Sequence, residues 1–356
     1  MKKFLFGGLV GCLLMGCLAG CTPNEKKKII RISDVPYTVL SDSLGSEHPV
    51  TLLAYDGKVY WSGLTGNRVH AIDVKAKKEV CTFGRETTSL DRENQSFKVF
   101  LSTDGQVFLA DAIKGWLFKY TLDSENTVKE EMVTCARDRG ATRMTHLGKN
   151  HLVRLRPKGK KLFTITVDKQ QCQFGTFPTG KKYKNALNLY QGSIAFNPVN
   201  HLLVYSCSFL PYMATYSWDG SKLVLGHEVK KDFKHKVVDG EFRAGKGVGW
   251  GGIELGLTQS HVATIYRDRE VEGMTPTKNI SYLLTSGSKS LFVFDYELNL
   301  SYILNLPFPI MHVTGDVKSE KIYIITEFEN YTLIEIDLDK LKGVLKTNEE
   351  KLTTNI

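Results

Sequence analysis

The segment GEFRAGKG, residues 240–247, contains most of a phosphate-binding loop. That loop requires Gly, four free residues, Gly-Lys and then Ser or Thr, whose hydroxyl holds Mg²⁺. Gly247 stands where the hydroxyl residue is needed. A working loop also joins a buried strand to a helix, whereas the flanking sequences KKDFKHKVVD and VGWGGIELGL are charged or rich in glycine. The segment is therefore predicted to be a connection between blades of a repeat fold, and no nucleotide is expected to bind there.

Arginine and aromatic side chains gather in the long connecting segments of the chain. Arginine presents a planar fork to a carboxylate or a phosphate, and aromatic faces stack on sugar rings or cover apolar groups. Such a mixture suits an acidic glycan, a peptide carboxylate or an acidic protein surface. The alternative is that these loops are simply charged and solvated, with local acids as partners. The residues predicted to bind a ligand or partner are Arg137, Arg139, Arg143, Arg156, Tyr212, Arg243, Lys246, Trp250 and Arg267.

Catalytic motifs are absent from the sequence. The nine histidines show neither an HExxH motif nor a Cys/His zinc spacing, and no GxSxG elbow occurs. Six-bladed lactonases hold Ca²⁺ on inward-facing Glu, Asn and Asp side chains, and Asn197, Glu254 and Asp316 are the candidates here, although each is of a type that often ends a strand. We predict no catalytic residue, metal or cofactor, and keep a calcium-dependent lactonase or hydrolase with a site in the central channel as the alternative.

The elements that must position these residues follow a repeat. A polar turn followed by an apolar strand recurs six times, and the strand onsets are separated by 48, 45, 50, 60 and 60 residues. A near-constant period with four short strands is typical of propeller blades. The sequence therefore predicts an all-β protein, a six-bladed β-propeller of four-stranded antiparallel blades over residues 30–346, with a pair of β-sandwiches as the rival architecture. The onsets are Val59, Val107, Leu152, Leu202, Val262 and Ile322.

In a propeller, the connections from an outer strand to the next inner strand share one face with the loops between second and third strands. Function gathers on long loops carried by a rigid scaffold, so this face is predicted to bind the ligand. Residues 29–40 are expected to complete the sheet of the last blade and to cover an edge that would otherwise aggregate. The long loops are residues 84–96, 137–143, 178–192, 229–252 and 267–279.

The N-terminus has the features of a bacterial lipoprotein signal. Lys2 and Lys3 precede an apolar stretch that is short for a membrane span, and LAGC ends at Cys21. Cys21 is predicted to be lipidated, because it would be the first residue of the mature protein. Two or more acyl chains, such as palmitate, anchor a protein firmly. The alternative is a plain secretory leader. Thr22 stands where Asp would signal inner-membrane retention, which favours the outer membrane.

The chain is thus predicted to contain a signal peptide (1–20), a lipidated tether (21–29), the propeller and a C-terminal tail (347–356). The net charge of +9 falls to about +7 without the signal peptide. This charge is spread along the chain and indicates solubility and attraction to anionic surfaces, with no signature of nucleic-acid binding. No disulfide framework appears among Cys81, Cys135, Cys172 and Cys207.

The lipoprotein signal, the six degenerate blades, the SWDGSKL turn at 217–223 and the run at 290–329 resemble the TolB-like six-bladed propeller lipoproteins of Gram-negative anaerobes. The fifth blade departs from that pattern, with DYELNL in place of an aromatic-Asp-Gly turn. The resemblance covers essentially the whole mature chain and implies an envelope-anchored binding or scaffold protein. It supplies no catalytic residues. The predicted function is ligand or protein binding through the loop-rich face, with a structural role in an envelope complex as a further alternative.

Replacing Cys21 with Ser tests the anchor. The hydroxyl cannot take the thioether-linked lipid, so the variant should move to the soluble envelope fraction or keep its uncleaved leader. Membrane fractionation with metabolic acyl labelling measures this outcome. A Ser variant that is still acylated and fractionates like the wild type contradicts the assignment.

Overall fold

The protein was analysed as a computed structural model, which describes residues 29–45, 48–63, 68–84, 97–101, 107–111, 116–123, 125–134, 143–148, 151–157, 159–167, 170–230, 234–246, 251–266 and 287–341. No helix in these ranges is long and apolar enough to cross a membrane.

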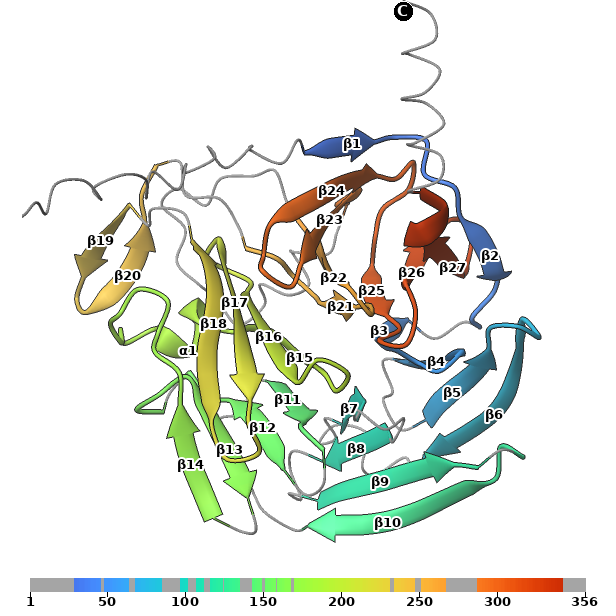
Figure 1. Cartoon of the computed structure of the whole chain (residues 1–356), viewed down its shortest axis with the longest axis horizontal. Coiled ribbons are helices and arrows are strands. Elements are labelled where there is room, and N and C mark those ends of the chain that lie inside the picture. The colour runs from blue at the N-terminus through green and yellow to red at the C-terminus, as the bar shows by residue number, and fades with distance from the viewer. Residues whose placement is uncertain are drawn as a thin grey trace, which may run out of the picture.

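Six sheets are arranged around a central axis, as the sequence repeat predicted (Figure 1). Each innermost strand contacts the innermost strand of the next blade, and the last contacts the first, so the ring is closed. The innermost strands are β3 (Pro49–Tyr55), β7 (Phe97–Leu101), β11 (Arg143–His146), β15 (Gly192–Asn197), β21 (Gly256–Leu257) and β25 (His312–Gly315).

The other strands of each blade follow outward in chain order. Blade one adds β4 (Lys58–Gly63), β5 (Arg68–Asp73) and β6 (Lys78–Gly84), and blade two adds β8 (Val107–Asp111), β9 (Trp116–Leu122) and β10 (Val128–Thr134). Blade three adds β12 (Leu152–Leu155), β13 (Phe163–Val167) and β14 (Gln170–Phe174), and blade four adds β16 (Leu202–Cys207), β17 (Tyr212–Trp218) and β18 (Leu223–Lys230). Blade five adds β22 (His261–Ile265), β23 (Ser290–Asp295) and β24 (Leu300–Asn305), and blade six adds β26 (Lys321–Glu327) and β27 (Tyr331–Asp337).

The repeat produces this fold because its apolar positions fill the space between neighbouring sheets. Val59, Val107, Val262 and Ile322, four of the predicted strand onsets, are completely buried. Branched side chains suit the pleated surface of a strand, and alternation at period two sends them to the faces that meet the next blade.

The N-terminal segment forms two short strands that pair with two different blades. Strand β2 (Thr38–Ser41) pairs antiparallel with β27 and completes blade six, as predicted. Strand β1 (Ile30–Ile32) instead pairs parallel with β24 as a fifth strand of blade five, so the prediction that all of residues 29–40 join blade six was wrong. Pro36 lies between the two strands; it lacks an N–H group and interrupts strand pairing. The segment therefore covers the outer edges of two blades.

Two glycines allow the inner strands of blades five and six to approach closely. A Cβ atom on Gly256 would lie 2.7 Å from the carbonyl carbon of Thr314, and one on Gly315 would lie 2.5 Å from the carbonyl oxygen of Leu257. Both obstacles are backbone atoms that no rotamer change can move away. Glycine is therefore required by packing at these two positions.

Gly315→Ala is expected to lower the free energy of unfolding by about 2 to 3 kcal/mol, because the added methyl group overpacks this contact. Gly226→Ala on the exposed strand β18, where the nearest atom is 3.4 Å away, is the matched control and should change stability by less than about 0.5 kcal/mol. Chemical denaturation of both variants measures the difference. Equal losses in the two variants contradict the packing argument.

Candidate functional site

The connection between blades four and five contains an antiparallel hairpin, β19 (His235–Val238) and β20 (Glu241–Ala244). Asp239 and Gly240 form its turn with φ values of 53° and 80°, the left-handed conformation that a tight two-residue hairpin turn requires. The segment GEFRAGKG is thus a turn residue followed by a strand. Over the described residues 240–246, it does not have the loop-to-helix form of a phosphate-binding loop.

This hairpin is fastened to the loop between blades three and four. The Asn185 amide donates to the carbonyl oxygen of Phe242 (3.0 Å) and its carbonyl accepts from the Phe242 N–H (3.1 Å). The Lys184 N–H donates to the carbonyl oxygen of Gly240 (2.9 Å), and the Tyr183 hydroxyl lies 2.9 Å from His235 Nε2. The short helix α1 (Ala186–Leu189) follows directly. Two of the long loops predicted to share one face of the propeller, 178–192 and 229–252, are therefore in contact.

The side chains of β20 alternate between the protein interior and solvent. Phe242 and Ala244 are buried against the protein, and the Phe242 ring stacks on His235 with centroids 4.7 Å apart. Arg243 between them is exposed. It lies directly opposite Lys236 on β19, and like charges in that arrangement destabilise a strand pair. Stability therefore gives no reason for this cation pair.

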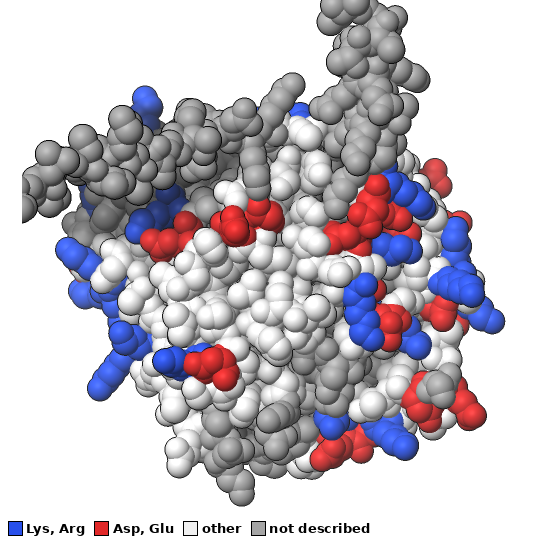
Figure 2. Space-filling model, in the orientation of Figure 1, with Lys and Arg blue, Asp and Glu red and all other residues white. Residues whose placement is uncertain are grey.

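The hairpin and its anchoring loop together form a surface that we call the basic hairpin surface. It carries seven exposed cations against two acids, Asp239 and Glu241. Figure 2 shows Lys and Arg gathered along the left margin of the molecule, where Figure 1 places β19 and β20. The hairpin thus lies beside blade four and not over the axial mouth. The cations are Lys181, Lys182, Lys184, Lys234, Lys236, Arg243 and Lys246.

A second group of polar residues lies where the inner strands begin, at the axial mouth on the same loop-bearing face. His312 Nδ1 is 2.8 Å from Glu254 Oε1, and Nε2 is 2.9 Å from the carbonyl oxygen of Pro49. Both ring nitrogens face acceptors, an arrangement that favours the doubly protonated, positively charged ring. Burial lowers the pKa of His312, but the charge and hydrogen bond of Glu254 and the Pro49 carbonyl outweigh burial and raise it overall. The charge of Arg143 opposes this rise, which places Arg143 near the same mouth.

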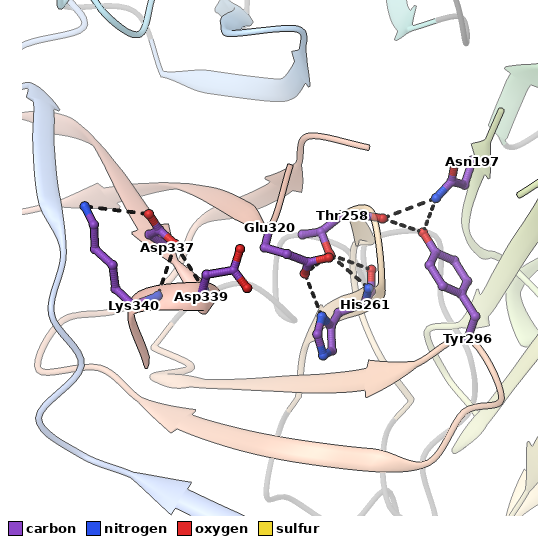
Figure 3. A network of polar contacts seen from close by, with 8 residues as sticks. All are labelled: Asn197, Thr258, His261, Tyr296, Glu320, Asp337, Asp339 and Lys340. Carbon is purple, nitrogen blue, oxygen red and sulfur yellow. Dashed lines mark hydrogen bonds and ion pairs between the residues drawn. The ribbon is translucent and has the colours of Figure 1, made fainter. Parts of the chain in front are cut away.

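At the opposite ends of the inner strands, polar side chains link consecutive blades (Figure 3). The Asn197 amide donates to the Tyr296 hydroxyl (2.6 Å) and to the carbonyl oxygen of Thr258 (3.2 Å), joining blade four to blade five. The Glu320 carboxylate accepts from the Thr258 hydroxyl (2.9 Å) and lies 2.7 Å from His261 Nδ1, joining blade five to blade six.

The last link of this series joins blade six to blade one. Asp316, which is 4 % exposed, accepts from the backbone N–H groups of Asp56 (3.2 Å) and Gly57 (3.5 Å) in the first turn of the repeat. It also accepts from the Lys318 N–H and the Ser319 hydroxyl in its own turn. Its carboxylate is therefore fully engaged in holding two turns.

The three residues considered for a calcium-dependent site do not come together. Glu254 lies beside the start of β25, whereas Asn197 and Asp316 lie at the far ends of β15 and β25, with blade five between them. Each is occupied by hydrogen bonds to a neighbouring blade. In the described ranges, no three His, Cys, Asp or Glu side chains gather as a metal-holding group.

The predicted binding residues are distributed unevenly. Arg243 and Lys246 belong to the basic hairpin surface, Arg143 lies at the axial mouth, and Arg156 follows β12 in a half-buried position. Tyr212 is only 3 % exposed and donates to Glu228 (3.0 Å) on the adjacent strand, so it is a core residue of blade four and not a surface contact. The remaining predicted residues, Cys21, Arg137, Arg139, Trp250 and Arg267, lie outside the described residues.

The lysines of the anchoring loop were not predicted as binding residues. Lys181, Lys182 and Lys184 lie about 50 residues before the hairpin, and only tertiary packing brings their loop against the hairpin turn at Gly240. The cluster of lysines in KKYKN was the available signal. The cysteines that the structure describes, Cys81, Cys172 and Cys207, form no disulfide.

Comparison with known proteins supports the fold and nothing finer. No family model matches the chain, and no curated protein matches it. A solved member of the DUF4221 family from Bacteroides vulgatus has a TM-score of 0.51 at 11% identity, over 85% of this chain and 95% of that one. A gluconolactonase from Xanthomonas campestris gives 0.47 at 10% identity (85% and 90% covered), and the Swd1 propeller domain from Myceliophteria thermophila gives 0.46 at 7% (85% and 99%). The chain is a six-bladed β-propeller.

Glu320 should make stability depend on acid pH. Burial raises the pKa of this carboxyl, but hydrogen bonds from His261 and its neighbours dominate and lower it to about 2. A carboxyl whose pKa is lowered by folding stabilises the protein above its unfolded pKa, near 4.5, and that contribution is lost as the pH falls toward 2. Glu320→Gln should therefore cost roughly 2 kcal/mol at neutral pH, with a smaller difference from wild type at each step below pH 4.5.

Urea denaturation at a series of pH values measures this dependence. Glu327→Gln, at an exposed position on β26, is the matched control and should follow the wild type throughout. A Glu320→Gln curve that runs parallel to the wild type from pH 7 to pH 2 contradicts the assigned role.

Proposed function

We propose that the protein is an envelope-anchored, non-catalytic binding protein that holds an acidic ligand on the basic hairpin surface of its propeller. The observation that carries the proposal is the cross-strand pair of Lys236 and Arg243, surrounded by five further exposed cations. An anionic ligand between the two side chains converts their repulsion into attraction. The repulsion between Lys236 and Arg243 destabilises the free protein and is offset only when an anionic ligand is bound.

The mode of attachment follows from the side chains. Arg243 offers a planar fork to a carboxylate, sulfate or phosphate, and the lysines act as mobile point charges around it. All seven cations are exposed, so each contact is screened by salt and modest in energy. Affinity must come from several contacts at once, which favours a ligand with repeated acidic groups, such as an acidic glycan, over a single small anion.

The hairpin supplies the rigidity that such a surface needs. The paired hydrogen bonds between Asn185 and the Phe242 backbone and the buried Phe242 ring fix the strand that carries Arg243. The lipid anchor at Cys21, in the outer membrane, remains part of the proposal on sequence grounds. It would hold the binding surface near the envelope.

The test compares two double variants that each lose two positive charges. Lys236→Ala with Arg243→Ala removes the cross-strand pair, and Lys129→Ala with Lys222→Ala removes two exposed lysines from blades two and four. Both should fold normally, because exposed charges contribute within about 0.5 kcal/mol each. The first should weaken heparin binding about tenfold or more and reduce the salt dependence by about two released counterions, while the second should bind like the wild type.

Calorimetry with heparin and with polyglutamate, each at several salt concentrations, measures these effects. Equal weakening in both double variants would show that net charge alone attracts the ligand. A wild-type protein that binds neither polyanion contradicts the proposal directly.

A further inference from the structure

The opposite face of the propeller contains an open cleft between blade one and blade six. Its volume is about 650 Å³, within the range of small-molecule sites. The turn after β3, the turn after β5, the turn after β25 and the closing strand β2 form its walls. It is separate from the basic hairpin surface, because it lies where the inner strands end and the hairpin leads into the start of one. The lining residues are Thr38, Leu40, Asp56, Gly57, Asp73, Val74, Lys75, Lys77, Asp316, Lys318, Ser319, Lys321, Tyr323 and Glu335.

The charges of this cleft cancel. Four lysines and four carboxylates line it, and the closest of them are already paired: Lys318 with Asp56 at 3.0 Å and Lys321 with Glu335 at 3.0 Å. A charged ligand would have to displace one of these partners. The paired groups still have hydrogen-bonding capacity, since an ammonium has three N–H donors and a carboxylate has about four lone-pair sites. The cleft therefore offers many donors and acceptors and no net charge.

Tyr323 gives this cleft an unused donor. The residue is 1 % exposed and lines the cleft, and its hydroxyl lies beside the Glu335 carboxylate without forming a hydrogen bond of ordinary geometry. Burial and the charges of Glu335 and Asp316 raise the pKa of Tyr323, so the hydroxyl keeps its proton. A buried hydroxyl without a partner costs about 1 to 3 kcal/mol. Few such groups occur in folded proteins.

The rim adds a second available donor. Lys75 is exposed in the turn after β5 and has no ion pair within the described part of the chain. The turn that carries it is fixed, because Asp73 accepts from the Ala76 N–H (2.8 Å) and Lys77 adopts a left-handed φ of 53°. The Lys77 ammonium reaches the carbonyl oxygen of Val39 on β2 (3.4 Å). The wall and the closing strand are thus held together.

We infer that this cleft binds a neutral, hydroxyl-rich ligand of the monosaccharide or disaccharide class. A sugar hydroxyl both donates and accepts, so it satisfies the free N–H groups of the paired lysines and the free lone pairs of the paired carboxylates without disturbing either pair. The Tyr323 hydroxyl donates to a ligand oxygen at the floor, and Lys75 donates at the rim. This site is independent of the acidic ligand proposed for the other face.

The test uses the full mature chain with glucose, galactose, N-acetylglucosamine, maltose and lactose as probes. Saturation-transfer NMR detects which of them bind, and calorimetry measures affinity. Tyr323→Phe deletes only the hydroxyl and should weaken binding about fivefold to tenfold, and Lys75→Met should weaken it about threefold. Tyr60→Phe, a buried tyrosine of blade one outside the cleft, is the matched control and should bind like the wild type.

Three results overturn the inference. Binding of none of the sugars removes the ligand class, as does Tyr323-dependent binding of glycine or inorganic phosphate in their place. Sugar binding that is unchanged in both Tyr323→Phe and Lys75→Met places the ligand elsewhere. If Tyr323→Phe lowers the melting temperature, Lys75→Met alone decides, because its side chain is exposed.

Discussion

The Asp316 carboxylate, shared between the last turn of the repeat and the first, is the contact on which the closed ring depends. A propeller must join its two ends without a covalent bond, and here the seam between blades six and one contains strand β2 on the outside and Asp316 on the inside. The Asn197 and Glu320 links continue the same series, the first from blade four to blade five and the second from blade five to blade six. Because each link joins neighbouring blades, loss of one loosens two sheets together. These polar side chains therefore stabilise the fold, although their types would also suit a metal site.

A rigid ring allows its two faces to differ in chemistry. On one face, the connection between blades four and five forms a hairpin whose inner side, Phe242 and Ala244, packs into the core, while its outer side carries two like charges opposite one another. On the other, short turns stay close to the axis and their charges pair across the seam, as Lys318 does with Asp56. The first face thus presents an excess of exposed positive charge, and the second presents hydrogen-bonding groups whose charges cancel. The two proposed ligands differ in charge for this reason.

The scaffold of the protein follows from the sequence more fully than the candidate site does. Six onsets with regular spacing predicted six blades, and the buried onsets confirm the phase of the strands. The pairing of residues 29–40 was predicted correctly for only one of the two strands that they form. An additional strand pairs with whichever sheet edge is open next to it in space, and the periodicity of the sequence does not indicate which edge that is. Tyr212 was misplaced for a related reason. An aromatic residue in an alternating strand faces either the core or a ligand, and its pairing with Glu228 depends on register.

The sequence by itself determined the strand period, the polar turns that precede the apolar strands and the positive charge of the long connections, because these depend on local alternation, on backbone conformation and on composition. It also showed that GEFRAGKG lacks the context of a phosphate loop. Only the tertiary structure decided which loops meet, that Lys184 and Arg243 share a surface, and that Asn197, Glu254 and Asp316 are separated. It also placed Tyr323 beside turns that lie about 250 to 270 residues earlier in the chain. Contacts of this kind arise from closure of the ring, which brings the first and last blades together regardless of their separation in sequence.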